Sequence, residues 1–334
     1  MIRRRRSLAR WALVFALATV GCDLAGSGRL HRVSARRMLM GTAFEIQVVT
    51  TDPRAGAAAI EAALDEVARV EELLSEWKPT SQISAVNLAA GGTAVVAVGA
   101  ELYEVVERAL EISELTAGAF DITYAACGHL WSFRDSRIPT DAELQACLPS
   151  VDYRRVELVT AGRGIRLPDA AMKIGISGIG KGYGVDRAAA LLESRGIKDY
   201  TVDGGGDLRV RGRNEAGPWR IGIADPRRPG TLARTLELDA GAVVTSGDYV
   251  LFFDQDGRRY HHILDPRTGR PAKRSIAVTV IATSATDADA LATGLFVLGP
   301  QRGLELVEKL SGIEALITDP DLVEHASSGF PKGH

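Results

Sequence analysis

The chain has 334 residues, of which 46% are hydrophobic and 25% are charged, and its formal net charge is −2. This composition excludes a disordered chain, a collagen-like chain and a small disulfide-dense protein, and the length allows one large hydrophobic core or two modest ones. The first 21 residues contain five Arg and no acidic residue, so the remaining 35 basic and 42 acidic side chains give a net charge of −7, which argues against nucleic acid as a partner.

The N-terminus has the pattern of a bacterial export signal. Four Arg residues are followed by an apolar run over residues 11–20, about half the length that a membrane-spanning helix needs. Gly21 and Cys22 come next, and a small residue directly before Cys resembles a lipobox, in which the Cys carries a diacylglycerol group. Thr19 stands where that box prefers Leu, so an ordinary signal peptide or an uncleaved anchor is the alternative.

We therefore predict a lipoprotein signal peptide over residues 1–21, a tether over 22–35 and a single compact domain over 36–334. The lipid on Cys22 would attach the protein to the cell envelope, on the periplasmic side of the inner membrane. In such an oxidising compartment Cys127 and Cys147 could form a disulfide, but their separation in space does not follow from the sequence.

The body of the chain alternates between helical and strand patterns without the regular repeat of a doubly wound fold. Helical spacing of apolar residues predicts helices over 57–77, 101–115, 141–147, 183–195, 287–298 and 300–310. Alternating or β-branched segments predict strands over 42–50, 155–160, 200–202, 219–224, 235–238, 250–254, 260–264, 275–283 and 313–318. This order favours an α+β fold with mixed, largely antiparallel sheets flanked by helices.

Two glycine-rich segments are candidates for ligand binding. Residues 174–186 (IGISGIGKGYGVD) would let the backbone approach a phosphate closely, with Lys181 supplying a positive charge. The spacing matches neither a Walker loop nor a Rossmann fingerprint, and a glycine-rich turn with a surface lysine is the alternative. In residues 203–207 (DGGGD), the two carboxylates could bind a hard cation or could simply be solvated acids in a turn.

Two further segments contain candidate catalytic and metal-binding side chains. His261 or His262 could accept a proton near neutral pH, although a histidine at a strand end is often structural. Asp289 and Thr293 are four residues apart on one predicted helix face, and oxygen ligands of this kind suit Mg²⁺. Alternatively, Asp287 caps that helix and Asp289 complements its dipole.

Taken together and in this order, these segments resemble the ApbE family, the FAD:protein FMN transferases of bacterial envelopes. The resemblance extends over about residues 36 to 318 and depends on a series of short motifs. These motifs are MGT at 40–42, SEW at 75–77, SQIS at 81–84 with Asn87, GAFDIT at 118–123, SGIGKGYGVD at 177–186, GGGD at 204–207, TSGDY at 245–249, HILDPRTG at 262–269 and DADALAT at 287–293.

The resemblance implies a role for each matching position. It implies that FAD is bound by Met40, Trp77, Gly118, Ala119, Phe120, Asp121, Lys181 and Ile263. It also implies a metal site made of the Gly178 carbonyl and the side chains of Asp289 and Thr293, with His262 as the catalytic base. The chain departs from the family at Gly175, where many members have Asp, and this leaves one polar contact to FAD unassigned.

The implied reaction is the Mg²⁺-dependent transfer of FMN from FAD to a threonine hydroxyl of an acceptor protein, through a phosphoester bond, with release of AMP. Acceptors typical of the family are subunits of envelope electron-transfer complexes. Two alternatives use the same site: a Mg²⁺-dependent pyrophosphatase that converts FAD to FMN and AMP, and a lipoprotein that binds FAD without catalysis.

Overall fold

The computed structural model describes residues 28–333. Within that range the largest sheet has eight strands in the order β1-β2-β6-β7-β11-β16-β17-β18, and all neighbouring pairs are antiparallel. The strands are β1 (His31–Leu39), β2 (Thr42–Thr50), β6 (Asp199–Gly204), β7 (Asp207–Arg211), β11 (Ala240–Gly247), β16 (Ala277–Ala282), β17 (Glu314–Thr318) and β18 (Glu324–Ala326).

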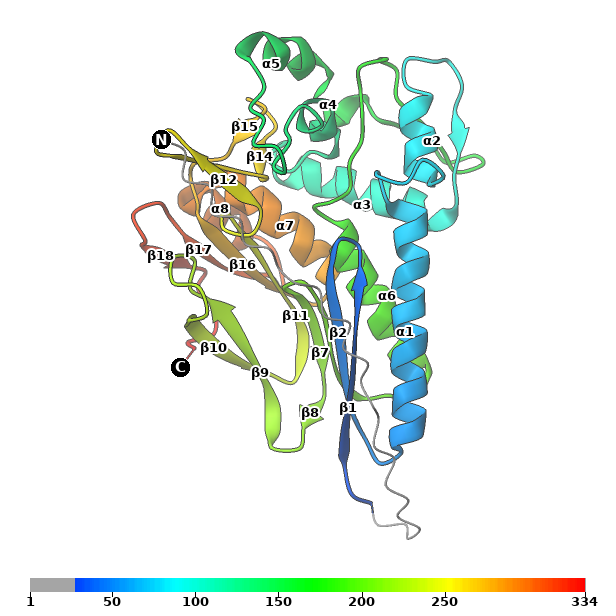
Figure 1. Cartoon of the computed structure of the whole chain (residues 1–334), viewed down its shortest axis with the longest axis vertical. Helices are drawn as coiled ribbons and strands as arrows, with labels where there is room; N and C mark the ends of the chain where they lie inside the picture. Colours follow the sequence, from blue (N-terminus) through cyan, green and yellow to red (C-terminus); the bar gives the residue numbers. More distant parts are fainter. Residues whose placement is uncertain (1–27, 334) are drawn as a thin grey trace.

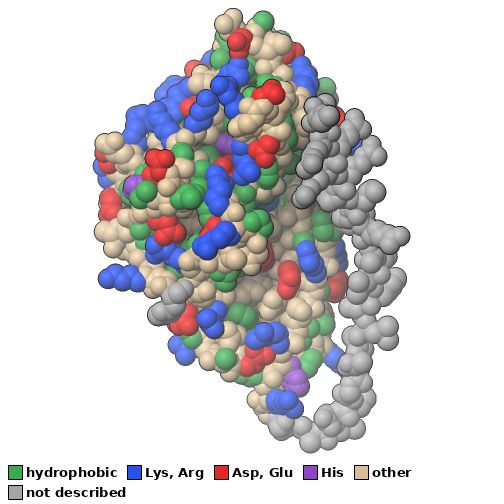
Figure 2. Space-filling view, turned by 60° about the vertical axis from the view of Figure 1, so that its left-hand side comes forward, with side chains coloured by type: hydrophobic (Ala, Val, Ile, Leu, Met, Phe, Trp, Pro, Cys, Tyr) green, Lys and Arg blue, Asp and Glu red, His purple; other side chains and the backbone are tan. Residues whose placement is uncertain are grey.

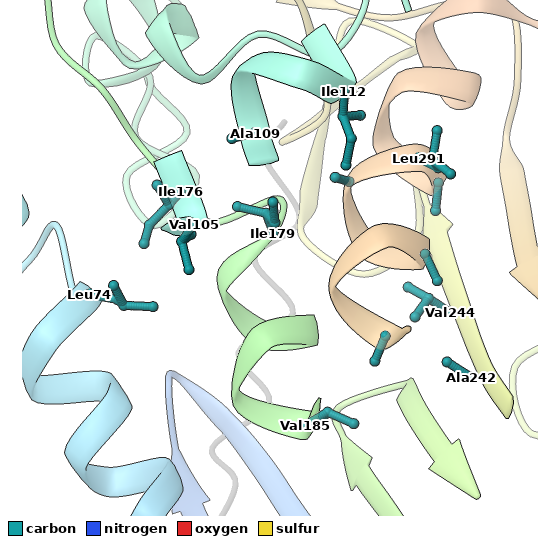
Figure 3. Packing of buried hydrophobic residues seen from close by; sticks show 14 of the residues in the cluster. Leu74, Val105, Ala109, Ile112, Ile176, Ile179, Val185, Ala242, Val244 and Leu291 are labelled. Atoms are coloured by element: carbon teal, nitrogen blue, oxygen red, sulfur yellow. The ribbon is translucent and has the colours of Figure 1, made fainter. Parts of the chain in front are cut away.

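One face of this sheet is covered by helices, which lie alongside it in Figure 1. They are α1 (Pro53–Leu74), α6 (Gly180–Ser194), α7 (Ala285–Leu298) and α8 (Pro300–Val307). The main hydrophobic core lies between the helices and the sheet, and the apolar residues that recur at helical spacing along α1 are buried in it. Figure 3 shows Leu74 of α1, Val105 of α3 (Ala100–Leu115), Val185 of α6 and Leu291 of α7 in this core.

The opposite face of the sheet is covered by a smaller antiparallel sheet of strands β8 (Arg213–Asn214), β9 (Gly217–Ala224) and β10 (Leu232–Leu238). Trp219, Ile221 and Ile223 alternate along β9 and form a second apolar cluster with Val210 and Val243 of the large sheet. Both faces of the large sheet are therefore buried, which gives a layered arrangement of helices, large sheet and small sheet (Figure 1).

A mostly helical region, drawn at the top of Figure 1, follows α1 in the chain. Its elements are α2 (Gln82–Leu88), α3 (Ala100–Leu115), η1 (Ile122–Tyr124), α4 (Ala125–Gly128), α5 (Asp141–Cys147), η2 (Leu148–Ser150), η3 (Tyr153–Arg155) and a sheet of β3 (Val96–Ala97), β5 (Gly164–Arg166) and β4 (Glu157–Val159). A disulfide joins Cys127 in α4 to Cys147 in α5, with Cα atoms 5.3 Å apart. This bond answers the question of cysteine pairing that the sequence leaves open.

Two short hairpins lie near this region: β12 (Phe252–Gln255) with β13 (Arg258–His261), and β14 (Leu264–Asp265) with β15 (Arg270–Pro271). Asp256 and Gly257, which connect β12 and β13, both have positive φ, as a two-residue hairpin turn of this twist requires. On the face shown in Figure 2, acidic and basic side chains are interspersed, and Lys and Arg side chains gather at the upper left.

The predicted α+β class, with largely antiparallel sheets flanked by helices, is confirmed, and most predicted elements occur within a few residues of their expected bounds. One boundary is wrong: β1 begins at His31, so residues 31–35 belong to the sheet and not to a tether. The pairing of β1 with β2 stabilises this polar segment, which has no apolar pattern that would identify it as a strand.

Several elements near the site were not predicted from the sequence, among them β7, which begins at Asp207, the strand β11 and the short helix α2. The strand β11 lies between β7 and β16 and contains two Ala and two Gly among its eight residues. Helix α7 packs against it, and its Val243 joins the apolar cluster formed with the small sheet. The short helix α2 has too few residues to show a period. The predicted signal peptide and Cys22 lie outside the described residues, and none of the helices from 28 to 333 is both long and apolar enough to cross a membrane.

Candidate functional site

A cavity of about 540 Å³ lies where the helical region meets the large sheet, and its size is typical of a small-molecule site. It is lined by almost every residue that the sequence predicts for the site: Met40, Trp77, Ala119, Phe120, Asp121, Gly178, Lys181, His262, Ile263, Asp289 and Thr293. Gly118 is the exception: it is not among the lining residues, and it adopts φ +75° in the turn that follows α3. Six segments that are distant in sequence thus meet at one place.

Met40 reaches the cavity from the tight turn between β1 and β2. Met40 and Gly41 both have positive φ and connect the paired residues Leu39 and Thr42, as in a two-residue hairpin. The Met40 N–H donates a hydrogen bond of 2.8 Å to the carboxylate of Glu71 in α1. A short turn and one bond to a helix therefore hold this side chain at the cavity wall.

The segment after α3 is held by the side chain of Asp121. Its carboxylate accepts hydrogen bonds from the Thr123 N–H (2.8 Å), the Thr123 hydroxyl (2.6 Å) and the Tyr153 N–H (3.0 Å). Asp121 therefore fixes the turn at the start of η1 against the backbone of Tyr153, and these bonds use much of the accepting capacity of its carboxylate.

The glycine-rich segment is anchored from α2. The side-chain amide of Asn87 donates to the Ile174 carbonyl (2.9 Å) and accepts from the Ile174 N–H (2.8 Å). This pair of bonds accounts for Asn87 in the sequence motif and holds the backbone that leads to Gly175 and Gly178.

The helix α6 begins at Gly180, three residues earlier than predicted, so several of the glycines belong to the helix itself. A Cβ atom at Gly182 would lie 2.2 Å from the carbonyl oxygen of Ala285 and 2.9 Å from the Cβ of Asp289. Gly182 therefore allows α6 and α7 to touch, a role in helix packing that the sequence did not reveal.

The start of α7 is held by Asp186, the last residue of the glycine-rich motif. Its carboxylate accepts from the N–H groups of Ala285 (3.0 Å) and Thr286 (2.9 Å) and from the hydroxyls of Ser284 (2.8 Å) and Thr286 (2.7 Å). The guanidinium of Arg209 donates a fifth bond of 2.5 Å. A carboxylate at a helix N-terminus satisfies unpaired N–H groups and interacts favourably with the helix dipole. Asp186 was not selected from the sequence, although its position at the end of the motif was a signal.

Asp287 does not cap α7, contrary to the structural alternative considered above. Ser284 is the N-cap residue and accepts from the Asp287 N–H, whereas the Asp287 carboxylate pairs with Arg108 of α3 (2.7 and 2.9 Å).

A cluster of one half-buried lysine and two buried carboxylates lies at the end of the cavity nearest α7. The Lys181 ammonium lies 2.7 Å from the Asp207 carboxylate and 3.4 Å from that of Asp289, which also accepts from the Gly182 N–H (3.1 Å). Burial and the neighbouring Asp289 charge raise the pKa of Asp207. Burial lowers the pKa of Lys181, but the two carboxylates outweigh it and raise the net value, so the ammonium stays charged.

The donor set around Asp289 fits a hard cation. Thr293 is one turn further along α7, and its hydroxyl oxygen lies 3.3 Å from the position of a Cβ on Gly178, so hydroxyl, carboxylate and Gly178 backbone are close together. Carboxylate, hydroxyl and carbonyl oxygens are the ligands that Mg²⁺ prefers, usually completed by water or substrate phosphate. Among residues 28–333 no group of three or more His, Cys, Asp or Glu side chains is arranged to hold a metal, so a cation here would depend on this mixed set.

The structure distinguishes the two adjacent histidines. His261 is buried against Phe296 and its Nε2 contacts the Ala272 carbonyl, so it belongs to the core. His262 lines the cavity, and its Nδ1 lies 3.2 Å from the Leu251 carbonyl. A carbonyl can only accept, so Nδ1 carries the proton and Nε2 keeps a free lone pair. Burial lowers the pKa of His262 to about 4, and the ring is therefore neutral at pH 7.

Two residues of the DGGGD segment differ in environment. Asp203 accepts from the Gly206 N–H (2.8 Å) and stabilises the β6–β7 turn, in which Gly205 and Gly206 have positive φ. Asp207 faces Lys181 in the cavity. Asp203 is therefore a turn residue, and Asp207 is the member of this segment that faces the cavity.

Comparisons with known proteins identify the family of this chain. A sequence model of the ApbE family matches residues 40–317. The FAD:protein FMN transferase of Vibrio cholerae is 34% identical over 331 residues, which cover 96% of this chain and 96% of the relative. The FAD:protein FMN transferase of Treponema pallidum is 35% identical over 340 residues, with 95% and 92% covered.

Two solved structures of ApbE proteins are also similar to this chain over most of its length. The ApbE protein of Thermotoga maritima has a TM-score of 0.82 and 33% identity, covering 90% of this chain and 98% of its own. The flavin transferase ApbE of Vibrio cholerae has a TM-score of 0.80 and 33% identity, covering 92% and 100%. The similarity therefore includes both the fold and nearly the whole length of the chain.

Proposed function

Because this chain belongs to the ApbE family, we propose that it is an FAD:protein FMN transferase that uses Mg²⁺ and a threonine hydroxyl of an acceptor protein. The observation that carries the proposal is the cluster of Lys181, Asp289, Thr293 and the Gly178 backbone at one end of a cavity. Such a cluster offers both a cation site and a fixed positive charge for a pyrophosphate.

The reaction joins the threonine oxygen to the phosphorus of the FMN portion of FAD. The bond from that phosphorus to the bridging oxygen breaks, and AMP leaves with the bond electrons. Mg²⁺ held by Asp289, Thr293 and the Gly178 carbonyl would neutralise charge on the phosphates. Lys181 binds a phosphate oxygen, and Asp207 keeps its ammonium in place when Asp289 binds the cation.

His262 is the base of this proposal. Its Nε2 is unprotonated at neutral pH and accepts the threonine proton, while the Nδ1 bond to Leu251 orients the ring. Trp77 lines the cavity and is 83% exposed, so it offers an uncovered aromatic face on which a flat ring of FAD can stack.

The location of the enzyme follows from the predicted lipid anchor at Cys22, which would hold it on the periplasmic side of the inner membrane. The Cys127–Cys147 disulfide supports a location outside the cytoplasm, because such bonds persist in oxidising compartments. A flavoprotein subunit of an envelope electron-transfer complex, with an accessible threonine, is the corresponding acceptor.

The test is mass spectrometry of a threonine-bearing acceptor domain after incubation with FAD, Mg²⁺ and the purified full chain. We expect a mass gain equal to FMN and one AMP for each modified acceptor, and neither product with D289A or with a chelator. Replacing the acceptor threonine by valine should abolish both products. AMP formation that is independent of the acceptor would instead establish a pyrophosphatase, and bound FAD without AMP would establish a carrier.

A further inference from the structure

Glu76 presents a carboxyl group to the same cavity, and neither its position nor its surroundings is explained by the phosphate chemistry. It follows the end of α1 by two residues and lies beside Trp77 in the cavity wall. A Cβ atom on Gly175 would lie 2.6 Å from the Glu76 Oε2 atom and 3.0 Å from the Cβ of Ala125. The carboxyl therefore occupies the space that a side chain at position 175 would fill.

This carboxyl has no protein partner among the described residues. Lys78, the nearest basic residue in the chain, pairs with Glu71 at 3.2 Å and with Glu72. The hydroxyl of Tyr124, which faces the same wall, bonds to Ser177 at 2.6 Å. Burial alone raises the pKa of Glu76 to about 7, with no hydrogen bond or positive charge to oppose it.

Glu76 is partly buried, so its carboxyl loses part of its hydration without gaining a hydrogen bond from the protein, and this lowers the stability of the free protein. Apolar groups would fill the same volume at lower cost, and many of the other side chains that line the cavity are apolar, among them Phe120, Ile176, Ile263, Leu264 and Pro266. A pocket lined largely by apolar side chains, with a few well-placed polar groups, is suited to a flat ring that has a hydrogen-bond donor on its edge.

We propose that Glu76 is a specificity residue, whose carboxyl accepts a hydrogen bond from an N–H group on a ring of the bound dinucleotide. The proposal rests on the proposed function, since FAD is the ligand. Two of its groups share the required chemistry: the imide N–H of the isoalloxazine ring and the amino group of adenine. Gly175 is part of the same device, because it leaves room for the carboxyl, and its N–H is held by the Ile122 carbonyl at 2.8 Å.

The experiment measures the FAD affinity of the purified full chain by calorimetry. No metal or acceptor is added, so that no turnover occurs. We expect E76L to bind FAD about 10- to 100-fold more weakly than the wild type, the range for one hydrogen bond to a charged group. E76L should unfold at the same or a higher temperature, since no native bond is removed. G175A should weaken binding in the same direction by displacing the carboxyl, whereas E72L, which changes an exposed acid on α1, should bind as the wild type.

Two analogues identify the donor. N3-methyl FAD lacks the imide N–H, and the hypoxanthine analogue of FAD lacks the adenine amino group. The wild type should discriminate against one of them, and E76L should not discriminate against that one.

Two results would overturn the proposal. If E76L binds FAD within twofold of the wild type and still transfers FMN, the proposed role of Glu76 is refuted and the proposed function stands. A wild-type chain that binds no FAD and transfers no FMN refutes the proposed function and this inference with it.

Discussion

Removing the carboxylate of Asp186 should loosen α7 and weaken the cation site that this helix supports. Asp186 lies on α6, yet its five hydrogen bonds reach the first turn of α7 and Arg209 of β7. Asp289 and Thr293 are the next residues along α7 that face the cavity. The position of the proposed cation ligands therefore depends on a residue that does not touch the cavity itself.

The magnitude follows from what D186A leaves behind. Two N–H groups and two hydroxyls lose their acceptor in a place where the Asp186 side chain is only 18% exposed, and Arg209 loses its ion pair. Truncating one partner of such a buried charged network costs about 3–5 kcal/mol. D186N keeps the volume and one accepting oxygen, so it should cost about 1–2 kcal/mol, close to the value of a helix cap and its dipole interaction.

The assay has two parts, urea unfolding and the Mg²⁺ concentration that gives the half-maximal transfer rate. We expect D186N to need at least about tenfold more Mg²⁺, which corresponds to about 1.4 kcal/mol at the cation site. S284A, which removes the N-cap and one bond to Asp186, should lower stability by about 1 kcal/mol with a smaller change in Mg²⁺ requirement. D65N changes a carboxylate whose side chain is 72% exposed, and should change neither quantity measurably.

Two results would refute this reasoning. If D186A unfolds within 0.5 kcal/mol of the wild type, the hydrogen bonds to α7 contribute little. If D186N is destabilised but keeps its Mg²⁺ requirement, Asp186 supports the fold and does not position the proposed ligands.

Three further predictions concern stability. Replacing both Cys127 and Cys147 by Ser should lower the free energy of unfolding by about 3 kcal/mol in urea titrations, because the bond closes a loop with a sequence separation of 20; no change in the midpoint would contradict this. Glu76 has a folded-state pKa of about 7 against an ordinary value of 4.5, so the folded state binds the proton more tightly than the unfolded state does. As the pH rises from about 4 to about 8, the free energy of unfolding of the wild type should therefore fall by about 3 kcal/mol relative to that of E76Q. Parallel profiles of unfolding free energy against pH for the two proteins would be inconsistent with this. G182A should cost about 1–3 kcal/mol because its Cβ meets the Ala285 carbonyl, whereas G180A, whose Cβ has its nearest neighbour at 3.7 Å, should not destabilise; equal effects would show that the α6–α7 contact is not tight there.

The sequence by itself determined the elements whose signals are local. The apolar stripe of α1 and the Asp-Gly turn between β12 and β13 require only neighbouring residues, and both occur as predicted. The short motifs indicated the family and the residues that line the cavity, because their types and order are properties of the chain alone.

Tertiary structure decided what depends on pairs of residues distant in sequence. Only the packing of α6 on α7 shows that Gly182 is a contact point and that Asp186 holds the start of α7, about 100 positions further along the chain. Only the position of α4 beside α5 brings Cys127 to Cys147. Glu76 and Gly175 are 99 positions apart, and their complementarity depends on one carboxyl filling the space that the other residue leaves. Periodicity and turn chemistry report on a few neighbouring residues, whereas such contacts are selected by the packing of the whole core.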